Sequence, residues 1–253
     1  MTAARKAFVL ILAIGLLTTG VGGETRHDAD VLVALGAGVA GTWETEFDFA
    51  NNESLPLSVF AGEQPHEFVC VTSPCGIAFA TLPRTGSARI VATPADFGRF
   101  TGRLFVGAHD AEELPAVRAR VVNRARPSQA IELPLFRRST LVTLDPRVLA
   151  FPSAVRTTGA HTNLFVSEIE LVNALSVLVE VYSPAGEQLG QRTIALAPGE
   201  TVFLQDVLGT LGITQLSEGQ IRVTKSSGAG KMWGLTATVY DDGRVSVATG
   251  KHP

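Results

Sequence analysis

Hydrophobic and polar residues alternate along several short segments of the chain. Phe47 and Phe49 flank Asp48, and the stretches 55–60 and 177–182 show the same alternation. Successive side chains of a β-strand point to opposite faces of its sheet, so a period of two predicts strands with one buried and one solvated face. The chain is therefore expected to consist mainly of short strands.

Turn-forming residues separate these segments roughly every ten residues. They cluster at 51–54, 184–186 and 197–200, and the sequence Asp-Asp-Gly at 241–243 predicts a tight hairpin between two apolar runs. Strands with this spacing are typical of a β-sandwich with about seven strands. Two other stretches, 95–100 and 204–213, have helix-like spacing and predict a turn or a brief helix.

The strand pattern occurs twice along the chain. The apolar positions of the two copies agree in phase, and this agreement predicts a duplicated domain. The aligned segments are 43–51 with 165–173 (offset 122), 82–90 with 196–204 (offset 114), 102–106 with 219–223 (offset 117) and 117–121 with 235–239 (offset 118).

The two copies meet near residues 144–147, where no Gly/Ser-rich linker separates them. We therefore expect an all-β protein with two β-sandwich domains in contact, residues 24–145 and residues 146–253. The extra chain of the first copy, between Gly62 and Leu82, is expected to form an inserted hairpin.

The N-terminus has the three-part pattern of a secretory signal peptide. Arg5 and Lys6 precede an uncharged apolar run at 7–17, and small residues follow at 18–23. We predict cleavage after Gly23. An uncleaved membrane anchor is the alternative, but a spanning helix needs about 20 apolar residues. No later stretch is long and apolar enough to span a bilayer, so no membrane insertion is expected after cleavage.

The chain carries a net charge of −3, and −5 without residues 1–23, which hold two basic residues and no acid. Nucleic-acid binding requires a basic patch, and attraction to an anionic membrane requires clustered cations. The charge therefore argues against a nucleic-acid partner and gives no reason to expect membrane binding.

The cysteines are Cys70 and Cys75, both inside the insertion. An exported protein meets oxidising conditions, so the sequence predicts a short-loop disulfide between them. A metal site formed by His66 with these two cysteines is the sharper alternative, but it lacks a fourth ligand at regular spacing. We expect no metal and no cofactor.

Residues 82–86, Leu-Pro-Arg-Thr-Gly, match the pattern that sortases cleave. Sortase substrates carry this motif near the C-terminus, before an apolar stretch and a basic tail. Here it lies in the middle of the chain, in phase with a strand segment of the second copy. We interpret it as a turn at the end of a strand.

Four aromatic residues are candidates for stacking on a sugar. Trp43 and Trp233 are in phase with the apolar positions of their strands and are expected to pack in the core. Tyr182 and Tyr240 have the opposite phase, so they are the candidate exposed ligand-binding residues.

The sequence contains little that points to catalysis. It has neither a Gly-x-Ser-x-Gly nor a His-Glu-x-x-His motif, and its histidines have no ligand spacing. The pairs Glu44/Glu46 and Glu168/Glu170 each share one face of a predicted strand, where two carboxylates could act as acid and base. A solvated strand face explains them as well, so the chain is expected not to be an enzyme.

The second copy shows a recognisable order of strands and turns at 162–173, 179–190 and 196–200. This order resembles tandem Ig-like repeats of secreted bacterial proteins. The resemblance implies two Ig-like β-sandwiches that are secreted, periplasmic or on the cell surface, often accessory to adhesion or enzyme anchoring. It transfers no catalytic residue.

Three functions compete on these grounds. The first is an exported, non-catalytic binding or structural module with an unknown protein or glycan partner. The second is a carbohydrate-binding module that uses Tyr182 and Tyr240. The third is an extracellular hydrolase with paired carboxylates in a cleft.

Overall fold

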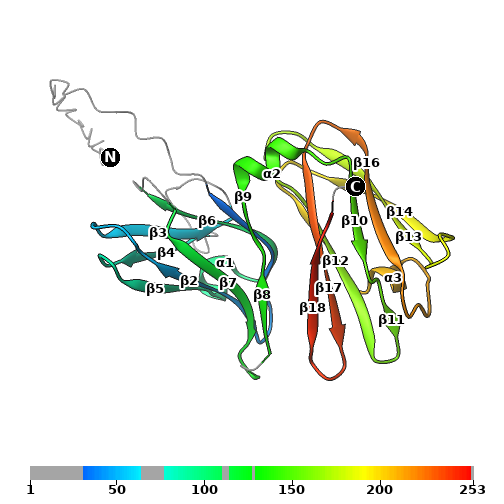
Figure 1. Ribbon diagram of the computed structural model, residues 1–253, viewed down its shortest axis with the longest axis horizontal. Helices are drawn as coiled ribbons and strands as arrows, with labels where there is room; N and C mark the ends of the chain where they lie inside the picture. Colours follow the sequence, from blue (N-terminus) through cyan, green and yellow to red (C-terminus); the bar gives the residue numbers. More distant parts are fainter. Residues whose placement is uncertain (1–30, 64–76, 110–113, 127–128, 252–253) are drawn as a thin grey trace, which may run out of the picture.

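The computed structural model describes residues 31–63, 77–109, 114–126 and 129–251, and the secondary structure of these residues is nearly all β. The strands form four antiparallel sheets, consistent with two β-sandwiches (Figure 1). The predicted all-β class is therefore confirmed. The predicted signal peptide, residues 1–23, lies outside the described residues.

The first half forms two sheets. Sheet A has the strand order β4-β3-β6-β1-β9 and sheet B the order β5-β2-β7-β8. The bounds are β1 (Leu32–Val39), β2 (Trp43–Ala50), β3 (Leu57–Gly62), β4 (Ile77–Leu82), β5 (Ser87–Ala92), α1 (Pro94–Phe97), β6 (Phe100–His109), β7 (Ala116–Asn123), β8 (Ala130–Leu133) and β9 (Leu135–Arg137). Helix α2 (Arg138–Leu144) then leads into the second half.

The second half also forms two sheets. Sheet C has the order β10-β16-β13-β14, and sheet D has the order β11-β12-β17-β18 with β15 paired to β12. The bounds are β10 (Val148–Pro152), β11 (Arg156–Thr157), β12 (Ala160–Glu168), β13 (Leu175–Tyr182), β14 (Gln188–Leu196), β15 (Thr201–Leu204), α3 (Val207–Thr210), β16 (Gln220–Gly228), β17 (Met232–Tyr240) and β18 (Val245–Thr249).

The two halves share one strand order. The run β4-β3-β6-β1 corresponds to β14-β13-β16-β10, and β5-β2-β7-β8 corresponds to β15-β12-β17-β18. Helix α1 follows β5 as α3 follows β15, which confirms a brief helix in both stretches where the sequence predicts one. The hairpin predicted at 241–243 is also present, since the Gly243 N–H donates to the Tyr240 carbonyl at 2.8 Å.

Two threonines show which residues of β2 and β12 occupy equivalent positions in the two halves. Thr45 Oγ1 accepts from Gly38 N at 2.8 Å and donates to Gly38 O at 3.0 Å, and Thr162 makes the same two bonds to Val155 at 2.9 and 3.1 Å. Equivalent positions of β2 and β12 are thus 117 residues apart, and the predicted offset of 122 is wrong. Because β12 is buried on both faces, its apolar residues do not alternate and could not fix the register.

The strand pairing of β2 and β12 with their neighbours confirms one predicted offset between the two copies and corrects another. Ile90 pairs with Phe47, and Leu204 pairs with Leu164 at the equivalent position, which confirms the offset of 114. The partners of Phe47 and Leu164 on their other sides are Ala119 and Thr236. Strands β7 and β17 are therefore offset by 117, not by the predicted 118, and a slip of one residue reverses the face of every side chain.

The first sandwich encloses its own apolar core between sheets A and B. Its largest buried side chains come from β2, β3, β4 and β6, and they include Phe47, Phe49, Leu57, Val59, Leu82 and Leu104. Trp43 is half-buried against this core, as the phase of β2 predicts.

The core of the second sandwich extends into the first half. Val33 and Leu35 on β1, Phe105 on β6 and Leu141 on α2 belong to the same buried cluster as the core of sheets C and D. These side chains point away from the first core and pack on the outer face of sheet D. We call this contact between sheets A and D the seam; in Figure 1 it lies between β9 and β18.

Two glycines let the sheets approach closely at the seam. A Cβ atom on Gly36 would lie 3.2 Å from Leu235 Cδ2, and one on Gly102 would lie 3.2 Å from Thr201 Cβ. Gly36 also has a φ of +74° at an irregularity in the β1–β6 register, a backbone conformation that other residues adopt at a cost.

Trp233 lies in the seam and not inside the second sandwich. It is only 7% exposed, its indole N–H donates to the Leu141 carbonyl at 2.9 Å, and its ring stacks on Phe136 at 6.1 Å between centroids. The prediction that Trp233 is buried is confirmed, but the one-residue slip of β17 turns it toward the first half.

We predict that Phe105→Ala lowers the free energy of unfolding by about 3 kcal/mol, because it leaves a cavity in the seam. Urea denaturation followed by tryptophan fluorescence measures this. Phe79→Ala is the matched control, because the Phe79 side chain is 51% exposed. A loss no larger than that of the control would contradict burial of Phe105 between the halves.

Candidate functional site

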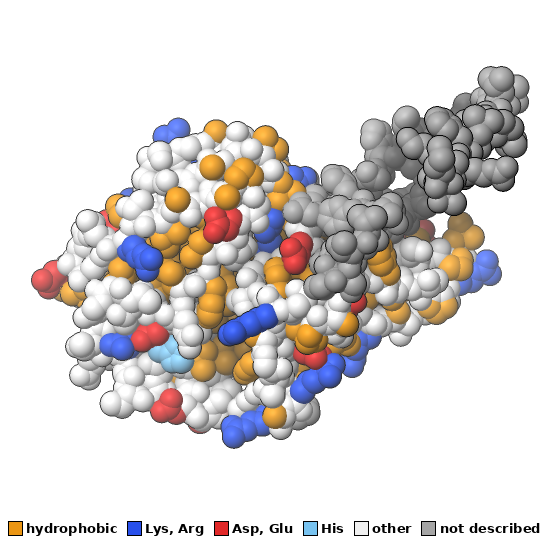
Figure 2. All heavy atoms as spheres, turned by 180° about the vertical axis from the view of Figure 1, so that it is seen from behind, with side chains coloured by type: hydrophobic (Ala, Val, Ile, Leu, Met, Phe, Trp, Pro, Cys, Tyr) orange, Lys and Arg blue, Asp and Glu red, His pale blue; other side chains and the backbone are white. Residues whose placement is uncertain are grey.

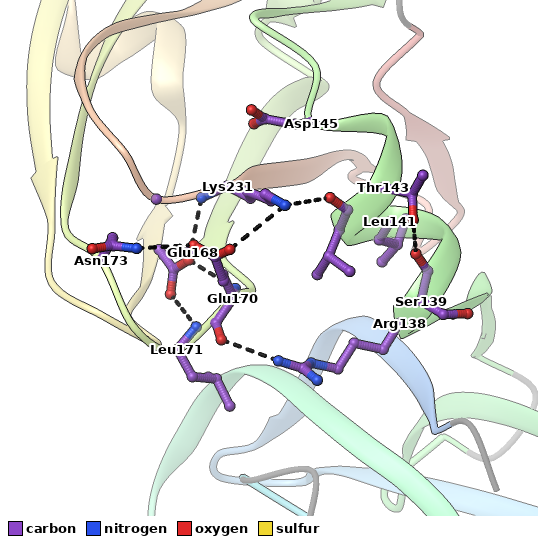
Figure 3. A network of polar contacts seen from close by, with 12 residues as sticks. Arg138, Ser139, Leu141, Thr143, Asp145, Glu168, Glu170, Leu171, Asn173 and Lys231 are labelled. Carbon is purple, nitrogen blue, oxygen red and sulfur yellow. Dashed lines mark hydrogen bonds and ion pairs between the residues drawn. The ribbon is translucent and has the colours of Figure 1, made fainter.

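Glu168 is the central residue of a polar network at one end of the seam (Figure 3). The side chain is fully buried at the end of β12. Its carboxylate accepts from the backbone N–H groups of Glu170, Leu171, Gly199 and Lys231 at 2.7, 2.8, 2.7 and 3.3 Å. One carboxylate thus holds three loops, and it supports the left-handed backbone of Leu171 at φ 74°.

Two cations connect this network to helix α2. Lys231 Nζ donates to the Val142 carbonyl at 2.6 Å and lies 3.5 Å from Glu170 Oε1. Arg138 Nη2 donates to the Glu170 carbonyl at 3.0 Å. Figure 3 shows both side chains reaching across the space between α2 and the loop that follows β12. The network therefore ties the connecting helix to the second sandwich.

Arg103 is a buried cation in the same region. The residue is 5% exposed, its guanidinium lies 5.1 Å from the Phe105 ring centroid, and its Nε finds no hydrogen-bond acceptor among the described residues. Burial lowers its pKa to about 10, although the nearby carboxylates of Glu168 and Glu63 favour the charged form. Burial likewise raises the pKa of Glu63, against the opposing effect of Arg103. These groups are costly to bury and point to a structural junction.

Tyr182 and Tyr240, the predicted ligand-binding residues, lie on different sheets. Tyr182 ends β13 in sheet C, and its hydroxyl donates to Glu180 Oε1 at 2.8 Å, which raises the pKa of the tyrosine. Tyr240 ends β17 in sheet D, and the Arg244 guanidinium lies 5.0 Å from its ring centroid. The two tyrosines thus come from different sheets of the second sandwich, and their joint role in ligand binding stays a prediction. Cys70 and Cys75 lie outside the described residues.

The carboxylate pairs considered for acid–base chemistry form ion pairs or hydrogen bonds within the fold. Glu44 pairs with Arg124, and Glu46 lies 2.8 Å from Arg120 Nη2. The Glu168 and Glu170 carboxylates belong to the network at the seam. Basic side chains lie scattered among acidic and uncharged ones on the face shown in Figure 2. Within the described residues, no group of three or more His, Cys, Asp or Glu side chains is placed to hold a metal ion.

A hollow of about 420 Å³ lies at the other end of the second sandwich, where β11 and α3 are found in Figure 1. We call it the α3 pocket. The turn between β11 and β12, the residues on either side of α3 and the β17–β18 hairpin supply its lining. The side chains used below are Arg156, Thr157, Thr158, His161, Gln205 and Asp206, with Thr214, Gln215 and Asp241 across the opening.

An ion pair organises the lining of the α3 pocket. Arg156 Nε donates to both carboxylate oxygens of Asp206 at 3.1 and 2.9 Å, and its Nη1 donates to the Ile213 carbonyl at 2.7 Å. Each side chain of the pair is 29% exposed. The arginine thus joins the strand before the pocket to both ends of the loop that carries α3.

The backbone around Asp206 is shaped to place its carboxylate. The backbone of Asp206 adopts the left-handed conformation, with φ 45°. Its N–H donates to Asn163 Oδ1 at 2.9 Å, and its side chain accepts from Gly209 N at 3.1 Å. A Cβ on Gly209 would lie 2.3 Å from Asp206 Oδ2, so only glycine fits there. Aspartate tolerates this conformation better than most residues do.

The sequence pattern did not identify the Arg156–Asp206 pair. One signal was present, since an aspartate inside the predicted stretch 204–213 is a typical N-cap residue for a brief helix. Its arginine partner lies 50 residues earlier in the chain. No local pattern connects two residues at that separation.

The comparisons with known proteins do not assign a family. No protein family model matches the chain, and no curated protein does. A crystal structure of Thermotoga maritima 1070 matches with a TM-score of 0.35 and 13% identity, over 43% of this chain and 95% of that one. A lectin of Pleurotus ostreatus in its apo form matches with a TM-score of 0.18 and 10% identity, over 88% of this chain and 76% of that one. Neither likeness is close enough to support an argument. None of the helices in the described part is long and apolar enough to cross a bilayer.

Two substitutions separate the roles of the buried charges. We predict that Glu168→Gln lowers the free energy of unfolding by about 2–4 kcal/mol, because an amide cannot accept as many of the four N–H groups. We predict that Arg103→Met also lowers the free energy of unfolding, by about 1–3 kcal/mol, because it leaves the nearby Glu168 and Glu63 carboxylates without a compensating cation. Chemical denaturation of both variants measures this. Unchanged or increased stability of Arg103→Met would show that the two carboxylates do not depend on this cation.

Glu63 gives a pH-dependent prediction. Its pKa is raised in the folded chain, so the folded state holds this proton to a higher pH than the unfolded state does. Its contribution to stability is present below the unfolded pKa and is lost as the pH rises through the folded pKa. Glu63→Gln should therefore gain stability relative to the wild type between about pH 4 and pH 7. Urea titrations at both pH values test this, and a relative loss at pH 7 would reverse the assignment.

Proposed function

We propose that the chain is an exported, non-catalytic binding module that holds a ligand in the α3 pocket. The observation that carries the proposal is the fixed geometry of this pocket. The guanidinium of Arg156 is held by three hydrogen bonds, and the carboxylate of Asp206 by the arginine and by Gly209 N. Groups that are already in place cost less entropy when a ligand binds.

The left-handed conformation of Asp206 supports the same proposal. Left-handed backbone at a non-glycine residue persists only where the surroundings impose it, and such residues gather at ligand sites. Asn163, which is 8% exposed, imposes it here through the bond to the Asp206 N–H. Asn163 belongs to β12, so the pocket is anchored in the central strand of sheet D.

The proposal includes the Ig-like character of the two sandwiches and their origin by duplication. The shared strand order of the two halves and the equivalent bonds of Thr45 and Thr162 support it. It also includes export after removal of residues 1–23, which rests on the basic, apolar and small-residue pattern of that segment.

A variant that fills the α3 pocket tests the binding role. Thr158 is exposed and lines the pocket, so Thr158→Trp should block it without disturbing the core. Thr193→Trp, on the exposed face of β14, is the matched control. Both variants and the wild type are measured by biolayer interferometry against purified peptidoglycan, chitin, cellulose and extracellular-matrix proteins.

We expect at least one of these ligands to bind the wild type and the control, to lose about tenfold or more in affinity for Thr158→Trp, and to be recovered chemically intact. Equal binding by Thr158→Trp, or no binding by the wild type, would count against the α3 pocket as the site. Recovery of a cleaved ligand would contradict the non-catalytic role.

A further inference from the structure

The ligand-facing groups of the α3 pocket are mostly neutral and able both to donate and to accept hydrogen bonds. Three threonine hydroxyls, at 157, 158 and 214, and two glutamine amides, at 205 and 215, surround the opening. Each of these groups offers a donor and an acceptor. The imidazole of His161 adds a donor and an acceptor in its neutral form.

The charged residues of the pocket are largely compensated. The positive charge of the Arg156 guanidinium is balanced by the Asp206 carboxylate, and its Nη1 also donates to the Ile213 carbonyl. Asp241 is an exposed carboxylate at the opening, and its backbone N–H is bound to the Gly159 carbonyl at 2.9 Å. An anionic ligand would meet this carboxylate and an arginine whose positive charge Asp206 already balances.

Apolar ligands and simple cations also match this pocket poorly. Ala160 is the lining residue with a purely apolar side chain, so the apolar surface of the lining comes largely from the carbon atoms of polar residues and lies beside hydrogen-bonding groups. The attraction of a cation to a single exposed carboxylate is worth about 1 kcal/mol or less, because water and salt screen it. A neutral ligand with many hydroxyl groups satisfies the lining best.

We propose that the α3 pocket binds a neutral saccharide unit through hydrogen bonds to its hydroxyl groups. This inference rests on the proposed binding function and names its ligand class. A sugar hydroxyl is a donor and an acceptor at once, and it complements threonine, glutamine and carboxylate groups alike. The volume of about 420 Å³ lies within the range of small-molecule sites. The exposed opening suits one unit of a longer chain that continues into solvent.

Nuclear magnetic resonance titration of the ¹⁵N-labelled chain tests the ligand class. The probes are methyl glycosides of glucose, galactose, mannose and N-acetylglucosamine and short oligosaccharides of each, with spermidine and citrate as charged comparisons. We expect saturable shifts of the amides at 157–161, 205–206 and 214–215 for at least one saccharide, with a Kd of about 1 mM or lower.

Neighbouring aspartates provide the matched variants. Asp241→Asn should weaken saccharide binding about tenfold, because it replaces the carboxylate acceptor at the opening. Asp242→Asn should leave it unchanged, because Asp242 lies next to Asp241 but pairs with Arg244 at 2.7 Å. Gln215→Ala is expected to weaken binding as well, in contrast to Gln191→Ala on β14.

The outcomes separate the two proposals. Saccharide shifts that map to the α3 pocket and weaken in Asp241→Asn support the inference. If no saccharide binds, if spermidine or citrate binds better, or if saccharide shifts map elsewhere, the ligand class is wrong. In each of those cases the binding function is judged separately, by whether Thr158→Trp abolishes capture of the larger ligands.

Discussion

The packing of sheet A on sheet D is the contact on which the rest of the structure depends. A β-sandwich normally buries the inner faces of its sheets and leaves the outer faces exposed to solvent. Here the outer faces of two sheets are apolar as well, and Val33, Leu35 and Phe105 continue the core of the second half. The consequence is a stack of four sheets in which the two sandwiches share buried surface.

The seam also explains the unusual placement of charge. Glu168, Arg103 and Lys231 lie where the loops of the second half meet sheet A and helix α2. A buried carboxylate with four N–H donors holds those loops in one arrangement, and loss of one partner leaves the others uncompensated. Such a network fixes the geometry of a junction more than it adds to stability.

Strand β12 links the seam to the candidate site. One end of it carries Glu168, and the other end carries His161 and Asn163 beside the α3 pocket. Its outer face packs on sheet A, and its inner face packs in the core of the second half. The backbone that supports the pocket is therefore buried on both sides, which suits a site that binds without rearrangement.

Much of the fold was predictable from alternation and turn chemistry, because these are local. The hairpin at 241–243, the brief helices and the all-β class all follow from residues close together in the chain. The register of β12 and the direction of Trp233 were not predictable, because a strand buried on both faces loses its alternation. The Arg156–Asp206 pair was missed for another reason: its members are far apart in sequence and meet only through the fold.

The central claim is that the two sandwiches are joined into one cooperative unit. Differential scanning calorimetry of the purified chain tests it most directly. Because the halves share a buried core, we expect one transition whose van't Hoff enthalpy equals the calorimetric enthalpy. Two separable transitions, or a van't Hoff enthalpy near half of the calorimetric value, would mean that the halves unfold independently and that the seam does not hold them together.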